Sequence, residues 1–110
     1  MSNTLINIGV PCIILNAAVD VEPGDVFALP SRACVMGWQT SFDENPSTVS
    51  LALEIAMEEV GPWTSLDTST TVTPALRTIS TPTAARFIRA NIVDNDDDAE
   101  VTIELICKVP

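Results

Sequence analysis

The sequence of 110 residues predicts an all-β protein, an antiparallel β-sandwich of about eight strands. Threonine occurs twelve times and proline eight times, and clusters of these residues interrupt the chain every ten or so positions. Short apolar runs at this spacing, bounded by turn residues, are typical of a sandwich or a barrel. Several runs also alternate apolar and polar residues, as strands with one buried face do. The sequence therefore predicts one layered β-domain.

The chain divides into an N-terminal arm, residues 1–11, and a single sandwich domain, residues 12–110. The clearest breaks between strands are Pro23-Gly24, Asn45-Pro46 and Gly61-Pro62, because proline and glycine favour turns. The expected strands are residues 12–19, 26–29, 33–42, 48–60, 63–68, 75–79, 85–93 and 101–109.

Residues 48–60 are compatible with two structures. With a period of two, alternate residues from Val49 to Met57 are apolar and face one way, whereas those from Ser50 to Glu58 face the other. With a helical period, Ser50, Glu54 and Glu58 form one polar stripe. The helix-forming residues favour the second structure. The unbroken alternation and the β-rich surroundings favour a strand, which is our prediction.

Composition excludes several classes of function. The formal net charge is −10, whereas binding to nucleic acid or to an anionic membrane requires clustered Lys and Arg. Histidine, the commonest general base and a frequent metal ligand, is absent. There is no apolar run long enough to cross a membrane, and the first residues lack the basic segment of a secretion signal. We expect no cofactor, no nucleic acid and no membrane partner.

The three cysteines, Cys12, Cys34 and Cys107, lie among apolar neighbours and lack C-x-x-C spacing. We expect buried, reduced thiols in a protein made in a reducing cytoplasm, in preference to a disulfide. A zinc site is not expected without His or paired thiols. No G-x-S-x-G turn occurs and no base is available to activate a nucleophile, so we do not expect an enzyme.

The acidic segment after residue 93 is the candidate metal site. Asp94, Asp96, Asp98 and Glu100 alternate as calcium ligands often do. The EF-hand pattern fails, because Ala99 stands where that loop needs glycine. A solvated hairpin tip that discourages pairing at the sheet edge is the preferred interpretation.

Aromatic residues are few. Phe27, Phe42 and Phe87 are expected in the core. Trp38 and Trp63 lie beside polar residues, so we expect both at an edge of the sandwich, with each indole N–H bound to a partner.

Two arginines, Arg86 and Arg89, flank an apolar pair on a predicted strand. They could pair with cross-strand acids such as Glu104 or Glu54, or contact an acidic neighbouring subunit. The sequence leaves both alternatives open.

An ordered set of motifs lies within about residues 37–109. The motifs are Gly37-Trp38-Gln39-Thr40, the strand Val49 to Glu54, the segment Gly61 to Ser69 with its W-x-x-L-D pattern, the strand Ala85-Arg86-Phe87-Ile88-Arg89-Ala90-Asn91, and the alternating closing strand. This set resembles small β-sandwich proteins of tailed-bacteriophage virions, and a similar arrangement occurs in discoidin-like, galactose-binding jelly rolls.

The resemblance implies a jelly-roll-like sandwich and a non-enzymatic virion structural protein. The expected role is a capsid decoration (cement) protein that binds the major capsid protein, or other virion subunits, on the outside of the head. A head–neck or tail accessory subunit is an alternative, as is a carbohydrate-binding discoidin-like module. The lack of an evident aromatic and basic cluster argues against the last. The expected location is the virion, assembled in the host cytoplasm.

We also expect a homo-oligomer. The apolar arm could extend as a strand onto a neighbouring sheet edge, so deletion of residues 2–10 is expected to abolish assembly and leave the fold intact. The candidate interface residues are Ile6, Ile8, Val10, Trp38, Trp63, Arg86 and Arg89.

Overall fold

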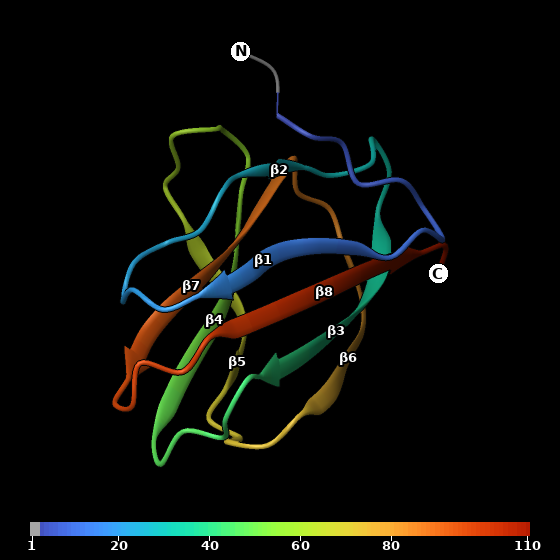
Figure 1. Ribbon diagram of the computed structural model, residues 1–110. Coiled ribbons are helices and arrows are strands. Elements are labelled where there is room, and N and C mark those ends of the chain that lie inside the picture. The colour runs from blue at the N-terminus through green and yellow to red at the C-terminus, as the bar shows by residue number, and fades with distance from the viewer. Residues whose placement is uncertain (1–2) are drawn as a thin grey trace.

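The computed structural model describes residues 3–110, and the regular secondary structure of this part is entirely β-strand. The eight strands are β1 (Cys12–Ala18), β2 (Phe27–Ala28), β3 (Cys34–Phe42), β4 (Val49–Ala56), β5 (Thr64–Ser69), β6 (Ala75–Thr83), β7 (Phe87–Asn95) and β8 (Val101–Lys108). They form two antiparallel sheets of four strands each (Figure 1). The predicted all-β sandwich of about eight strands is confirmed.

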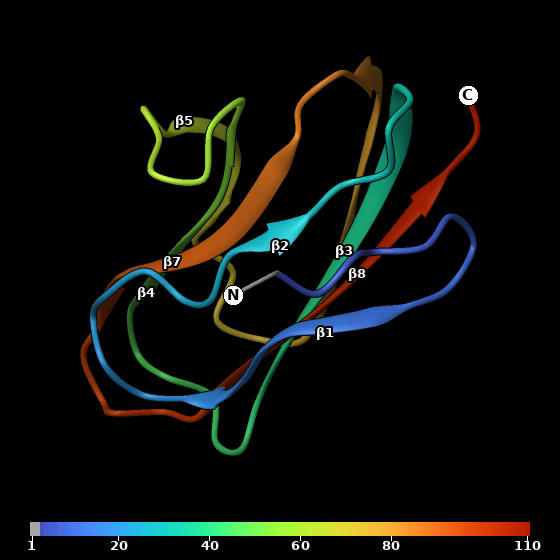
Figure 2. The ribbon, with the colours of Figure 1, turned by 90° about the horizontal axis from the view of Figure 1, so that it is seen from above.

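The strand order is that of a jelly roll. The sheets are β1-β8-β3-β6 and β2-β7-β4-β5, and Figure 2 shows them as two facing layers. The first strand pairs with the last, the second with the seventh, the third with the sixth and the fourth with the fifth, always antiparallel. The chain thus forms a long two-stranded antiparallel ribbon that wraps around one core. When the ribbon wraps, β3 pairs with β8 and β4 pairs with β7, and these pairs complete the two sheets.

Strand β4 settles the ambiguous segment. The helical alternative for residues 48–60 is wrong, because β4 is hydrogen-bonded to β5 on one side and to β7 on the other. Val49, Leu51 and Leu53 are buried in the core, as the period of two predicts. Met57 lies beyond the strand and is exposed. Pairing on both sides therefore outweighs the helical propensity of the segment.

Some boundaries differ from those predicted. Strand β6 continues to Thr83 instead of ending at Ile79, because Thr83 pairs with Cys34 across a register shift. Strand β7 begins two residues later than expected and ends at Asn95. Phe27 and Phe42 pack against the core as predicted, whereas half-buried Phe87 lies outside the core cluster.

The thiols are free in the described chain, with Cys34 and Cys107 buried and Cys12 half-buried. Burial, with a contribution from Cys34, raises the pKa of the Cys107 thiol to about 12. Such a thiol stays protonated at neutral pH, so it is a poor nucleophile. Within residues 3–110, Cys107 is therefore a core residue on the inner face of β8.

The described part of the N-terminal arm, residues 3–11, packs on its own subunit, and residues 1–2 of the predicted arm lie outside the described residues. Ile6 is 1% exposed and belongs to the core cluster. The Ile6 N–H donates to the Ala28 carbonyl (2.9 Å), and the Ala28 N–H donates to the Thr4 carbonyl (2.9 Å). The Gly9 N–H donates to the Cys107 carbonyl (2.7 Å). These contacts argue against the expectation that deletion of residues 2–10 leaves the fold intact, because Ile6 fills part of the core and the arm covers the edge of β2.

Candidate functional site

An apolar hollow of about 380 Å³ lies on the outer face of the β1-β8-β3-β6 sheet. Val35 and Gly37 of β3, Leu76 of β6 and Ile106 of β8 line it, and Lys108 stands at its margin. Leu76 is 67% exposed. An apolar hollow beside an exposed leucine has the shape and polarity to receive an apolar side chain of another protein. We call these residues the β3 patch.

Gly37 creates the hollow at the centre of the β3 patch. A Cβ atom built on Gly37 would lie 3.5 Å from Cγ2 of Ile106 and 4.0 Å from Cδ1 of Leu76, so the missing side chain leaves an open gap between them. The sequence reasoning did not identify this site. The signal that could have found it is Ile106, an apolar residue on the otherwise polar face of its strand.

A second hollow, of about 440 Å³, lies at one end of the sandwich. The β2–β3 connection contributes Pro30 and Arg32, and Arg86 comes from the β6–β7 connection. Met57 and Phe87 add apolar surface. The Arg86 guanidinium lies over the Phe87 ring, 5.8 Å from its centroid. Neither Arg32 nor Arg86 forms an ion pair with another residue of the described chain, so the alternative in which Arg86 pairs with a cross-strand acid such as Glu104 or Glu54 is wrong.

Arg89 belongs to a closed polar cluster on the outer face of the other sheet. Its Nε donates to Oε1 of Glu54 at 2.7 Å, so of the two alternatives that the sequence left open for Arg89, the structure shows the cross-strand pair. Its guanidinium lies 4.3 Å from the centroid of the Trp63 ring, a close cation–π geometry. Asn91 Nδ2 donates to the other Glu54 oxygen at 3.4 Å. Arg89 is thus held within its own subunit, and Trp63 is half-buried beside it.

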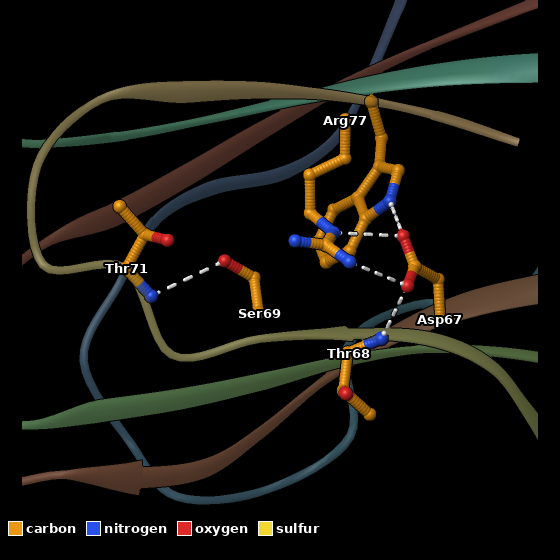
Figure 3. Close-up of polar contacts among 6 residues, drawn as sticks. Asp67, Thr68, Ser69, Thr71 and Arg77 are labelled. Atoms are coloured by element: carbon orange, nitrogen blue, oxygen red, sulfur yellow. Dashed lines mark hydrogen bonds and ion pairs between the residues drawn. The ribbon is translucent and has the colours of Figure 1, made fainter.

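Trp38 is buried in the core, and its indole joins the two sheets. Trp38 is 0% exposed, so the expectation that it lies at the sandwich edge, available to a neighbour, is wrong. The expected indole partner exists: Trp38 Nε1 donates to Oδ2 of Asp67 at 2.9 Å. Asp67 also accepts two bonds from Arg77, at 2.9 Å and 3.0 Å (Figure 3). Asp67 lies on β5 and Arg77 on β6, which belong to different sheets.

Hydrogen bonds from Arg77, with help from Trp38 and the Thr68 N–H, hold the pKa of Asp67 below its usual value. The sequence gives no sign of this contact, because the partners come from three strands of two sheets. Within residues 3–110 the Trp38–Asp67–Arg77 contact is a structural bridge that closes the β5/β6 side of the sandwich.

The opposite end of the sandwich is acidic. Nine acids lie in three neighbouring segments that contain no basic residue: Asp20, Glu22, Asp43, Glu44, Asp94, Asp96, Asp97, Asp98 and Glu100. We call this region the acidic end. The rest of the chain holds six acids and five bases, so nearly all of the net charge is at the acidic end.

Two of these carboxylates hold loops together. Asp43 Oδ1 accepts from the backbone N–H groups of Glu44 and Glu100, both at 2.8 Å, and these bonds lower the pKa of Asp43. Asp97 Oδ2 accepts from the Ser47 N–H at 2.6 Å, which lowers the pKa of Asp97. Buried Asn95 binds the Val19 and Ala99 carbonyls. The acidic end is therefore an ordered surface.

The four candidate calcium ligands do not form a site. Within residues 3–110 no group of three or more Asp, Glu, Cys or His side chains is placed to hold a metal ion. We expect millimolar calcium to shift the melting temperature by less than about 1 °C relative to sodium chloride of equal ionic strength, because only a ligand bound to the native state stabilises it. Calorimetry checks this expectation. A rise that saturates with calcium and disappears in Asp96→Asn would contradict it.

Residues 3–110 include no helix that could span a membrane. The sequence matches no model of a known protein family and no curated protein.

Proposed function

We propose that this chain is a non-enzymatic structural protein of a tailed-phage virion that decorates the outer surface of the head. The β3 patch is the observation that carries the proposal, because an exposed apolar face is suited to binding a partner protein. The jelly roll agrees with this role, although the same fold also serves lectins, so it does not decide between them. The motifs that resemble virion sandwich proteins add support.

The β3 patch would contact an apolar region of the major capsid protein. Leu76 projects beside the Gly37 hollow, and an apolar side chain of the partner could fill that hollow. Lys108 at the margin could pair with a carboxylate of the capsid surface. A head–neck or tail subunit would be bound through the same surface and differs only in the partner.

The test is co-sedimentation with purified heads of the phage that carries the gene. We expect wild-type chain in the head pellet and Leu76→Asp to reduce binding at least about tenfold, because a charge would be buried without a partner. Val93→Asp is the matched control. Val93 is 51% exposed on a strand of the other sheet, so this variant should bind as the wild type does. Equal loss in both variants, or wild-type chain left in the supernatant, would contradict the proposal.

The carbohydrate-binding alternative has a distinct readout. Trp38 is fully buried, so a sugar stacked on an indole would change the fluorescence of Trp63. Within the described chain, Glu54, Arg89 and Asn91 beside Trp63 already bind one another. Saturable quenching by a sugar that is lost in Trp63→Phe would support the lectin function and contradict the proposal of decoration alone.

A further inference from the structure

The two ends of the sandwich carry different charge. The β1–β2, β3–β4 and β7–β8 connections lie at the left and lower left in Figure 1, whereas the β2–β3, β4–β5 and β6–β7 connections lie towards the top. The first three connections hold eight of the nine acids of the acidic end, and the ninth, Asp94, lies near the end of β7. The connections at the top end hold two bases, Arg32 and Arg86, and two acids, Glu58 and Glu59. The negative charge is therefore concentrated at one end of the sandwich, so the two ends differ in net charge along the direction of the strands.

The arginine hollow at the top end is suited to carboxylates. Arg32 and Arg86 line the same hollow and are exposed, and neither is paired with an acid of residues 3–110. In contrast, Arg77 and Arg89 are both bound to carboxylates of their own subunit. Guanidinium groups bind carboxylates through two hydrogen bonds, and the adjacent apolar surface of Met57 and Phe87 excludes water from such contacts.

We propose that the acidic end of one copy docks into the Arg32/Arg86 hollow of a second copy, so that the chain associates head to tail. The occupant is a second copy because its acidic end is ordered, lacks basic residues and complements the hollow in charge. Two different surfaces meet in such a contact, so the association is heterologous and builds a ring or an open row of subunits. The inference does not depend on capsid binding, which uses the β3 patch.

Salt dependence distinguishes this contact from apolar association. At about 0.1 M salt the Debye length is about 10 Å, so distant like charges are screened while touching pairs still attract. We expect concentration-dependent self-association of the purified full chain in sedimentation velocity under these conditions. Raising the salt to about 1 M shortens the Debye length to about 3 Å and should weaken the association constant at least about tenfold. Association through the β3 patch would instead persist or strengthen.

Charge reversal locates the contact. We expect R32E/R86E to lose self-association, since it places acids opposite the acidic end. D96K/E100K should also lose it, and neither of these carboxylates accepts a hydrogen bond from another residue of the described chain. An equimolar mixture of the two variants should associate again, because one supplies an acidic hollow and the other a basic end. L76D should self-associate as the wild type does.

Circular dichroism establishes that each variant is folded before it is compared. A chain that remains monomeric at all concentrations, R32E/R86E that associates as the wild type does, or a mixture that fails to associate would each overturn the proposal. None of these results bears on binding to phage heads, which R32E/R86E monomers should retain through the β3 patch. Failure of the head-to-tail contact is thus distinguishable from failure of the decoration function.

Discussion

Deletion of residues 2–10 is expected to destabilise the fold by about 6 kcal/mol. Removing the buried Ile6 side chain alone should cost about 3 kcal/mol, and each lost backbone hydrogen bond about 1 kcal/mol. The bonds concerned join Thr4 and Ile6 to Ala28 and Gly9 to Cys107. Because small domains are stable by only about 5–15 kcal/mol, the truncated chain should be largely unfolded or close to it. Urea denaturation followed by tryptophan fluorescence measures the effect.

Point variants test whether the effect of the deletion comes from the arm residue that is buried in the core. Ile6→Ala should lower the free energy of unfolding by about 3 kcal/mol, whereas Val10→Ala should change it by less than about 0.5 kcal/mol. Val10 belongs to the same arm but is 54% exposed. Equal effects, or a truncated chain with the urea midpoint of the wild type, would show that the arm does not support the core. The measurement also bears on assembly. If the truncated chain is unfolded, its failure to assemble reflects the lost fold and not the loss of a contact surface between subunits.

Asp67→Ala is expected to lower the free energy of unfolding by about 3 kcal/mol. The buried indole N–H of Trp38 loses its acceptor, which costs about 1–3 kcal/mol. The Arg77 pair adds no more than about 1 kcal/mol, because the arginine side chain is 41% exposed. Asp96→Ala removes an exposed carboxylate and should have little effect. Similar destabilisation in both variants would rule out the bridge as its cause.

The same bridge predicts a pH dependence. The pKa of Asp67 is lowered in the folded protein, chiefly by its hydrogen bonds with Arg77. Its contribution to stability is therefore fully present above the unfolded pKa of about 3.9 and is lost as the pH falls through the folded value. The stability difference between wild type and Asp67→Asn should be constant from about pH 5 to 8 and shrink below about pH 4. A difference that persists undiminished at low pH would contradict this origin.

The candidate sites show where sequence reasoning succeeds. The pair between Arg89 and Glu54 was predictable, because both residues sit on strands whose alternation is clear and the pairing needs only a neighbouring strand. The lack of an ion pair between Arg86 and any acid of residues 3–110 was not predictable, since it depends on where the β6–β7 connection lies relative to those acids. The β3 patch was missed because its residues come from β3, β6 and β8, which are distant in sequence.

The sequence by itself determined the β class, the division into about eight strands and the inward faces of the main ones. On β8, for example, Val101, Ile103, Leu105 and Cys107 are all buried, as their alternation predicts. These properties are local, because a strand points successive side chains to opposite faces. Only the tertiary structure decided that Trp38 is a core residue bound to Asp67 and that Ile6 fills the core from the arm. It also decided that nine acids gather at one end while two arginines that pair with no acid of residues 3–110 line a hollow at the other. Those outcomes depend on which strands become neighbours when the ribbon wraps, and pairing between distant strands is a property of the whole chain.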